Sequence, residues 1–482
     1  MPLVSAQPAR DTPPVIPVIP VIPVIIEAAV SLWEGLRGLS LALDLTMGRR
    51  KGHAQAVAAL SVRVGRCFGL TDAELSDLAL AALLKDAGCP STRPAFTNQV
   101  GIDDIAFHRY IFALEEYTPR SFAALLWALH QSQTDRITTR VVGWTRSLLG
   151  FKRYAEDHKR AAKRSVEAAR IAAQLACPLS TIAALASAGE HWDGSGSPGV
   201  LNGDHIPLAS RIIAACQIAL IWGETAAPAA VAARLVGLRP GRFDPRVLRE
   251  TVRALQGLTT GAPPTWIDEL ARECGVLPFI AACDRPLDAL LLASTFAELV
   301  DIKSTFTGSH SLRVASLVGA MTALDRHSLT AGVTVSEAIL AALLHDLGKL
   351  AVPTTLLDKQ GPLTPQEWVI MRRHPADSAQ IIGTVAPWAE LATWAGAHHE
   401  RIDGCGYHRG LIGDAIPPIG RLLAVADAFD AMIVERPYRK GVAPDAALRR
   451  VRDARGKQFD PLAAELLETV VAQRGTTVDG AS

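Results

Sequence analysis

One stretch decides the fold of this chain: Leu343-Leu344-His345-Asp346-Leu347-Gly348-Lys349. An imidazole and a carboxylate stand side by side here, at the end of a run that is otherwise apolar. Burying a charge is costly unless something compensates it, and a bound cation would do so. A helix end with an ordinary ion pair is the plainer explanation of such a pair alone. Whether the pair binds a cation or forms an ordinary ion pair therefore depends on the histidines and aspartates on either side of the stretch.

The composition predicts two or three folded domains. The chain has 482 residues, which is long enough for hydrophobic cores that are stable without disulfides or structural metals. Its 49 lysines and arginines nearly balance its 48 aspartates and glutamates, so we expect no binding of DNA or RNA through a basic surface. The seven cysteines are scattered and form no CxxC pair, which favours a reducing cytoplasm over a disulfide framework.

The N-terminal residues 1–26 contain a repeated Pro-Val-Ile triplet between Pro13 and Ile26. A proline at every third position removes helix donors and fixes φ, which favours an extended polyproline-type tail. The segment is apolar, but it is shorter than a membrane span of about 20 residues, and no cluster of lysine or arginine precedes it. We therefore expect a disordered or partner-binding tail, with a membrane element as the alternative.

From Glu27 onward, apolar residues recur at helical spacing and strand-like alternation is scarce. This pattern predicts an all-α protein. Glycine predicts where helices end, at Gly69, Gly88, Gly348 and Gly383. Threonine and serine predict where helices begin, at Thr71, Ser336 and Thr364.

The chain contains an internal repeat. Residues 190–198 match residues 400–408, and Gly203-Asp204-His205-Ile206-Pro207 matches Gly413-Asp414-Ala415-Ile416-Pro417, each pair at the same offset. Upstream, residues 81–89 match residues 341–349. A long repeat of this kind indicates a duplicated structural unit. We predict one unit at residues 27–250 and a second at 286–475, with a connector at 251–285 and a short tail at 476–482.

The two copies differ in the residue types that bind metal ions. The paired positions, first copy against second, are Lys85 against His345, Ala188-Gly189 against His398-His399, and Gln217 against Asp427. A lysine ammonium has no lone pair to donate to a metal. We therefore expect the first copy to hold no ion and to act as a structural or regulatory partner of the second.

The second copy contains seven candidate metal ligands: His310, His345, Asp346, His374, His398, His399 and Asp427. One such residue alone is more often an ordinary buried polar group, but four of these seven stand against non-ligands in the first copy. Imidazole with carboxylate and no thiolate suits iron, manganese, zinc or nickel. Successive helical residues point about 100° apart, so we expect His398 and His399 to serve two different ions, with Asp346 bridging them.

Two metal ions a few ångströms apart are the usual active site of enzymes that carry out nucleophilic displacement at a phosphate group. They neutralise the phosphate and lower the pKa of a shared water from about 15.7 to roughly 7, so the predicted nucleophile is a metal-bound hydroxide. Lys349 follows Asp346 by one helical turn and is predicted to meet a phosphate oxygen. The alternative for Lys349 is a cation near a helix C-terminus, which is worth only about 0.3 to 1 kcal/mol. Asp346 and Lys349 are thus the predicted catalytic residues.

Together these motifs resemble the HD-GYP family of HD-superfamily metal-dependent phosphohydrolases. The resemblance covers about residues 295 to 470 and rests on many short motifs in a fixed order. They are residues 345–349, His374-Pro375, His398-His399-Glu400, Asp403-Gly404-Cys405-Gly406-Tyr407, residues 421–432 and Arg436-Pro437-Tyr438. The first copy resembles a degenerate member of the same family, so the resemblance implies two tandem HD-type helical domains.

The resemblance implies hydrolysis of cyclic di-GMP to linear pGpG or GMP at a binuclear site. It assigns the metals to the same seven residues, with iron or manganese first and zinc, nickel or magnesium as further candidates. Substrate contacts fall on Lys349, Tyr407, Arg436 and Arg439.

The chain departs from the family pattern at two positions. The Gly-Tyr-Pro of the family reads Gly406-Tyr407-His408, so the loop lacks a proline that would stiffen it. Phe306 stands where some members have an acidic ligand for a third ion. We therefore expect two metal ions.

Two alternatives stay open. One is a phosphohydrolase with the same metal site that acts on another nucleotide or phosphate ester. The other is an adaptor that binds a nucleotide or a signalling protein with little or no turnover. In each case we expect a cytoplasmic protein whose two copies form an intramolecular pseudo-dimer, or a homodimer of the whole chain.

Overall fold

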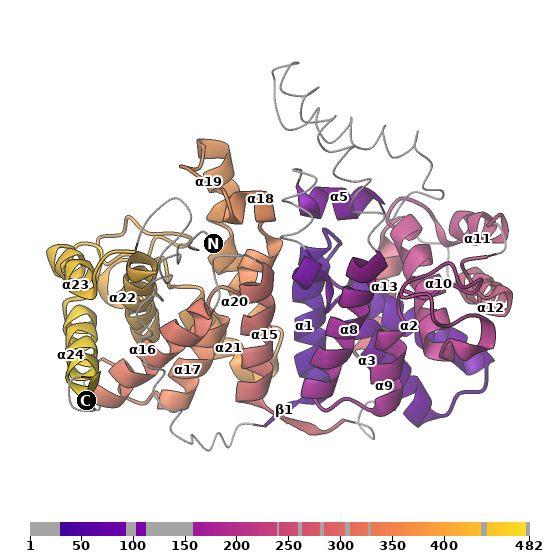
Figure 1. Ribbon diagram of the computed structural model, residues 1–482, viewed down its shortest axis with the longest axis horizontal. Helices are drawn as coiled ribbons and strands as arrows, with labels where there is room; N and C mark the ends of the chain where they lie inside the picture. Colours follow the sequence, from indigo (N-terminus) through magenta and orange to yellow (C-terminus); the bar gives the residue numbers. More distant parts are fainter. Residues whose placement is uncertain are drawn as a thin grey trace, which may run out of the picture.

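The computed structural model describes residues 29–92, 103–111, 158–238, 241–258, 263–279, 284–303, 309–325, 329–434 and 441–478. Two helical halves lie side by side (Figure 1), with the first half in indigo to magenta and the second in orange to yellow. Helices dominate both, which confirms the predicted all-α fold. The predicted tail at residues 1–26 lies outside the described residues.

The first half begins with a short strand and continues in helices. Its elements are β1 (Ala29–Ser31), α1 (Leu32–Thr46), α2 (His53–Cys67), α3 (Asp72–Leu84), η1 (Cys89–Thr92), α5 (Asp104–Ile111), α8 (His158–Gln174), α9 (Leu179–Ala186), η2 (Gly203–His205), α10 (Leu208–Gly223), α11 (Pro228–Val236), α12 (Pro245–Gln256) and α13 (Thr265–Cys274).

The second half has a similar order of elements. Its elements are β2 (Pro286–Asp288), α15 (Ala289–Lys303), α16 (His310–Leu324), α17 (Val335–Leu344), η3 (Leu347–Ala351), α18 (Thr354–Leu357), α19 (Pro365–Met371), α20 (His374–Ile382), η4 (Ala386–Trp388), α21 (Ala389–Ala395), η5 (Gly413–Ala415), α22 (Pro418–Ile433), α23 (Pro444–Asp453) and α24 (Pro461–Val478). In each half a three-residue strand leads into two helices of 15 residues.

The helix starts follow the capping chemistry of the sequence. Thr71 and Thr364 cap α3 and α19 as predicted, each in a capping box with the glutamate three residues later. Ser336 was predicted to start a helix, but the cap of α17 is Thr334, two residues earlier, and the helix begins at Val335. Thr334 is the cap because Glu337 lies three residues after it, and the two residues form a capping box.

The two halves are joined tightly. Strand β1 pairs antiparallel with β2, with Val30 opposite Leu287. The buried apolar side chains form one cluster that runs through both halves. Helix α1 approaches the second half through glycine, since a Cβ on Gly35 would lie only 2.6 Å from Leu292 Cδ2. The halves thus share a continuous core.

The predicted connector contains a helix that packs on the first half. Helix α13 packs against α2. The ring of Trp266 covers Gly223 of α10 so closely that a Cβ there would lie 2.1 Å from it. Its Nε1 donates a hydrogen bond of 3.2 Å to the carbonyl oxygen of Ala226. Residues 265–274 therefore associate with the first half, and the boundaries at 250 and 286 stay predictions.

Two side chains of the first half reach the elements next to the predicted site. The Nζ atom of Lys51, which lies between α1 and α2, is 3.7 Å from Oδ1 of Asp377 on α20. Asp104 of α5 is fully buried and accepts a hydrogen bond of 2.8 Å from the backbone N–H of Thr354, at the start of α18. The first half thus supports segments on either side of the site.

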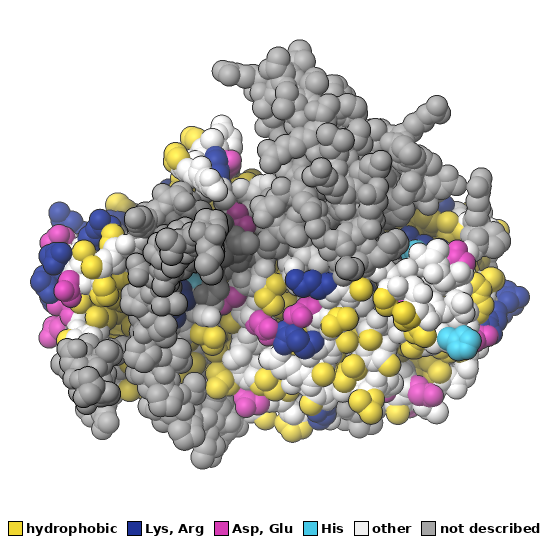
Figure 2. All heavy atoms as spheres, in the orientation of Figure 1, with side chains coloured by type: hydrophobic (Ala, Val, Ile, Leu, Met, Phe, Trp, Pro, Cys, Tyr) yellow, Lys and Arg dark blue, Asp and Glu magenta, His cyan; other side chains and the backbone are white. Residues whose placement is uncertain are grey.

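The surface shows the near balance of positive and negative charge that the composition indicated. On the face drawn in Figure 2, lysine and arginine side chains of the described residues are interspersed with aspartate and glutamate. Within the described ranges, no helix combines the length and the apolar character that crossing a membrane requires.

Candidate metal centre

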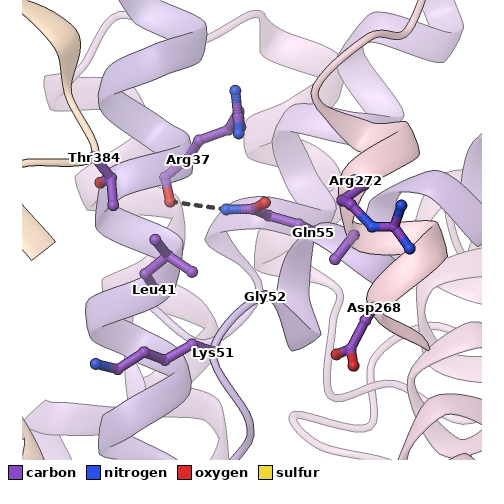
Figure 3. Close-up of a pocket in the computed structure, with 9 residues that line it drawn as sticks. Arg37, Leu41, Lys51, Gly52, Gln55, Asp268, Arg272 and Thr384 are labelled. Carbon is purple, nitrogen blue, oxygen red and sulfur yellow. Dashed lines mark hydrogen bonds between the residues drawn. The ribbon is translucent and has the colours of Figure 1, made fainter. Parts of the chain in front are cut away.

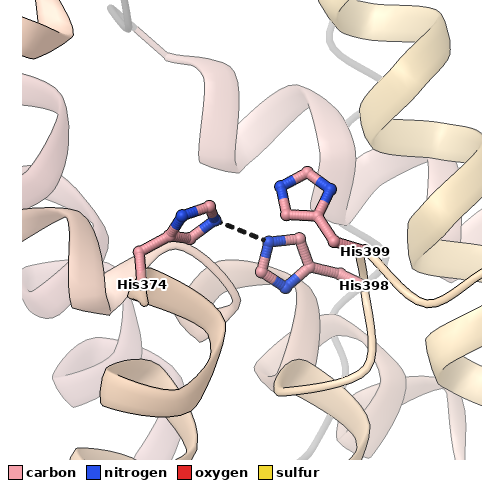
Figure 4. Close-up of side chains that lie close together, drawn as sticks. All are labelled: His374, His398 and His399. Carbon is pink, nitrogen blue, oxygen red and sulfur yellow. Dashed lines mark hydrogen bonds between the residues drawn. The ribbon is translucent and has the colours of Figure 1, made fainter. Parts of the chain in front are cut away.

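The predicted ligands of the second half converge in space, and they come from several elements. His310 and His374 are the first residues of α16 and α20, His345 follows α17, and Asp427 lies in α22. His310, His345 and Asp427 form one cluster and His374, His398 and His399 form another, each with its ligand atoms within 4.8 Å of one another. Figure 4 shows His374 pointing from its helix toward the neighbouring pair His398 and His399.

Asp346 lies between the two clusters. Its Oδ2 atom is 3.3 Å from Nε2 of His345 and 3.6 Å from Nε2 of His310. Its Oδ1 atom is 3.4 Å from Nε2 of His374 and 3.7 Å from Nε2 of His398. A single carboxylate therefore presents one oxygen to each cluster, which is the arrangement that a ligand shared by two cations needs.

Three imidazoles are held in the tautomer that metal binding requires. The Nδ1 atoms of His345, His374 and His398 lie 2.7, 2.7 and 2.6 Å from the carbonyl oxygens three residues earlier in the chain. A carbonyl only accepts hydrogen bonds, so each Nδ1 carries the hydrogen and each Nε2 keeps a lone pair. Such a backbone contact is the usual support of a metal-ligating histidine.

Three of the Nε2 atoms and one carboxylate oxygen lack partners that would satisfy them. Nε2 of His345 and Oδ1 of Asp346 are buried without a hydrogen bond. The Nε2 atoms of His374 and His398 face each other at 3.1 Å (Figure 4), although both carry lone pairs. Leaving buried polar atoms unpaired is destabilising by about 1 to 3 kcal/mol each. Divalent cations would satisfy all four atoms, so the residues present fit a metal centre.

For His374, His398 and Asp346, the electrostatics give the same protonation states. Burial lowers the pKa of His374 to about 3 and that of His398 well below its usual value, so both imidazoles are neutral near pH 7. Burial would raise the pKa of Asp346, but Lys349 and His345 outweigh it and hold the pKa well below its usual value. Neutral imidazoles and ionised carboxylates are the forms that bind metals.

One expectation about the ligands is not met. His398 and His399 were expected to serve different ions because helical neighbours diverge by about 100°. Both instead belong to the cluster with His374, and their ring centroids are 4.2 Å apart. Helix α21 ends at Ala395, so the helical angle does not apply at residues 398 and 399.

Asp430 was not among the residues predicted from the sequence. It is 1% exposed, and its Oδ2 lies 2.6 Å from Nδ1 of His310. Arg313 donates to both of its oxygens, at 2.7 and 2.9 Å. Asp430 therefore orients His310 so that its Nε2 faces Asp427, at 3.2 Å. Its spacing of three residues from Asp427 on α22 was the available signal.

Glu400 has a structural role that the sequence did not reveal. Its carboxylate is buried and accepts hydrogen bonds from the backbone N–H groups of Arg409 at 2.7 Å and Leu411 at 3.0 Å. In the first half, Glu190 accepts three such bonds from residues 199, 200 and 201. The glutamate therefore closes the same loop in both halves. In the second half this loop carries Tyr407.

The predicted substrate residues have different outcomes. The Nζ atom of Lys349 forms an ion pair with Oδ2 of Asp346. The ring of Tyr407 lies over that of His399, with 4.8 Å between centroids and 31° between planes. Both side chains thus adjoin the clusters. Arg436, Arg439 and Phe306 lie outside the described residues.

Gly348 allows two elements of the site to touch. A Cβ at this position would lie 2.0 Å from the carbonyl oxygen of His374. The N–H of Gly348 also donates a hydrogen bond of 2.8 Å to Oγ of Ser378. In the first half, a Cβ on Gly88 would lie 1.8 Å from the carbonyl oxygen of Arg164. The glycine of this motif is therefore needed for close packing of the backbone.

In the first half, an ammonium group stands where the second half has an imidazole. Lys85 is buried and forms an ion pair with the adjacent Asp86. Asp44 accepts hydrogen bonds from the N–H groups of Gly52 and Ala54, and burial raises its pKa to about 8. Lys85 therefore supplies a positive charge from within the chain.

A separate cavity of about 320 Å³ lies where the halves meet. Its lining combines α1, α2 and α13 of the first half with Thr384 of the second (Figure 3). Arg37, Lys51, Asp268 and Arg272 contribute charged groups to it. None of the predicted site residues that the structure describes lines this cavity, so it is distinct from the candidate metal centre.

Comparison with known proteins identifies the class. A family model described as an HD domain matches residues 294–462. The 3'3'-cGAMP-specific phosphodiesterase 3 of Vibrio cholerae serotype O1 is 32% identical over 444 residues, which cover 89% of this chain and 92% of that protein. The cyclic di-GMP phosphodiesterase response regulator RpfG of Xanthomonas campestris pv. campestris is 44% identical over 130 residues, or 27% of this chain and 34% of that protein.

A solved structure shares the whole architecture. The crystal structure of the cyclic GMP-AMP specific phosphodiesterase V-cGAP3 of V. cholerae matches with a TM-score of 0.62 and 26% identity, covering 92% of this chain and 98% of that one. The chain therefore belongs to the HD-GYP family, as its motifs predicted. It is an enzyme of the metal-dependent phosphohydrolase class.

Proposed function

We propose that the protein hydrolyses a cyclic dinucleotide at a centre of two divalent metal ions. The carboxylate of Asp346 carries this proposal, because its two oxygens face two separate clusters of ligand atoms. The proposed ligands are the residues predicted from the sequence: His310, His345, Asp346, His374, His398, His399 and Asp427. Iron and manganese are the first candidates for the metals.

Bound cations of this kind neutralise a phosphodiester and lower the pKa of water to about 7. The chain's own residues prepare the site for them. Asp430 holds the His310 ring by accepting from Nδ1. Lys349, now paired with Asp346, lies close enough to donate to a phosphate oxygen of the substrate. Tyr407, packed over His399, presents an aromatic ring to the sugar or base.

The proposed substrate is cyclic di-GMP, with linear pGpG or GMP as the product, and 3'3'-cGAMP is the second candidate. The relatives named for cyclic di-GMP support the first, although RpfG matches only about a quarter of this chain. The likeness that extends over both halves is to proteins named for cyclic GMP-AMP, and it favours the second.

The test is product analysis with cyclic di-GMP, 3'3'-cGAMP and cyclic di-AMP, together with the metal content of the protein. We expect purified protein loaded with manganese or iron to give a linear product and to contain two ions per chain. His345→Ala combined with Asp346→Ala should abolish turnover and lower the metal content. Robust turnover by this double variant would refute the proposal. Tight binding with the ligand unchanged would favour the adaptor.

We also propose that the first half acts as a structural or regulatory partner in an intramolecular pseudo-dimer. The shared core and the contact of Lys51 with Asp377 on α20 support this. Lys51→Ala is expected to change the rate of hydrolysis, and unchanged kinetics would argue against regulation through this contact.

A further inference from the structure

Arg372 lies beside the metal centre without belonging to it. It follows α19 and stands two residues before His374. Its guanidinium carbon is 5.4 Å from the ring centroid of Tyr407 and 5.5 Å from that of Trp368. Since Tyr407 itself packs over His399, the guanidinium and a proposed metal ligand both lie against the same aromatic side chain.

The guanidinium of Arg372 has no carboxylate partner among the described residues. Arg313, Arg401 and Arg421 near this end of the site are each paired with aspartate, whereas Arg373 and Arg409, like Arg372, have no carboxylate partner among the described residues; of these three, Arg372 alone lies over aromatic rings there. Arg372 is exposed, so its N–H donors are accessible to a ligand. A positive charge left unpaired beside a proposed phosphate site suits an anionic ligand.

The two aromatic rings hold this charge in place without neutralising it. Helix α19 buries none of its residues and stands out from the body of the second half (Figure 1). Trp368 is 41% exposed on this helix, so its ring is not needed for a core. Contacts between a guanidinium and aromatic faces restrict the orientation of the guanidinium plane and leave its edges free for hydrogen bonds. Arg372 is thus oriented before any ligand arrives.

A cyclic dinucleotide carries two phosphodiester groups, and the metal centre accounts for one of them. We propose that Arg372 binds the second phosphodiester, which rests on the function proposed above. A guanidinium matches the two non-bridging oxygens of such a group with two parallel N–H donors. Arg372 is then a substrate-binding residue that selects compounds with two phosphodiesters over those with one.

The experiment compares Arg372→Ala, Arg372→Lys and the neighbouring control Arg373→Ala, because Arg373 is exposed and its side chain makes no aromatic contact within the described residues. KM and kcat are measured on cyclic di-GMP, 3'3'-cGAMP and cyclic di-AMP, for each that the wild type hydrolyses. The same constants are measured on bis(p-nitrophenyl) phosphate, which has one phosphodiester. Metal content and melting temperature show whether each variant is folded and loaded.

For Arg372→Ala we expect KM for every cyclic dinucleotide to rise about 10- to 100-fold, as for the loss of a charge-assisted hydrogen bond, with kcat nearly unchanged. Constants for bis(p-nitrophenyl) phosphate should not change, Arg372→Lys should be intermediate, and Arg373→Ala should match the wild type. An unchanged KM in folded, loaded Arg372→Ala overturns the assignment, and so does a rise confined to guanine-containing substrates, which would place the guanidinium on a base. Wild type that hydrolyses bis(p-nitrophenyl) phosphate but neither binds nor hydrolyses any cyclic dinucleotide overturns the proposed function itself.

Discussion

The exchange Glu400→Gln tests whether the loop that carries Tyr407 must be anchored for activity. The carboxylate uses both oxygens on backbone N–H groups, and its residue is 2% exposed. Glutamine keeps one acceptor and turns an NH2 group toward the other N–H, so one bond is lost and a buried donor is left unpaired. The cost is about 1 to 3 kcal/mol, or a factor of about 5 to 150 in the population of the anchored loop.

The first half provides a matched control, since Glu190 anchors the corresponding loop there. We expect Glu400→Gln to raise KM for the cyclic dinucleotide severalfold or more. Both exchanges should lower the melting temperature, whereas Glu190→Gln should leave kcat/KM within about twofold of the wild type. Melting curves, metal content and steady-state kinetics on the three proteins are the measurements. Equal losses of activity in both variants, or a wild-type KM for Glu400→Gln, would refute the reasoning.

Three further predictions concern the metal centre. Asp430→Asn should weaken metal binding about 10- to 100-fold by freeing the His310 ring, and an unchanged metal titration would show that the contact is dispensable. Gly348→Ala should destabilise the protein by about 3 kcal/mol or more, because the new Cβ meets the carbonyl oxygen of His374; a wild-type melting temperature would contradict the close packing. In metal-free protein, the folded state binds fewer protons than the unfolded state between the pKa of His374, about 3, and its ordinary 6.5. Stability should therefore be lost as the pH falls through that window, and His374→Gln should flatten the dependence of the melting temperature on pH.

Much of the fold could be predicted because helix formation is governed by local signals. Apolar spacing predicted helices, and the boxes at Thr71 and Thr364 predicted where two of them begin. The start of α17 was misplaced because Thr334 and Ser336 both cap well, and the glutamate three residues after Thr334 decides between them.

The sequence led to the candidate ligands that lie together in the structure, but not to their grouping. Comparison of the two halves singled out four of the seven, His345, His398, His399 and Asp427, because the first half has residues that cannot bind a metal at those positions. The assignment of His398 and His399 to one cluster depends on where α21 ends, which spacing alone does not give. Asp430 and Glu400 act through contacts with residues distant in sequence or with backbone N–H groups, and such contacts leave little trace in a motif.

The ammonium of Lys85 has a consequence for how the protein meets metal scarcity. In the first half the positive charge facing a buried aspartate is covalently part of the chain, so this half needs no metal ion to balance that charge. The second half must acquire its cations from outside. Removing metal would thus leave the charge balance of the first half intact, and only the second half would need metal to be added back.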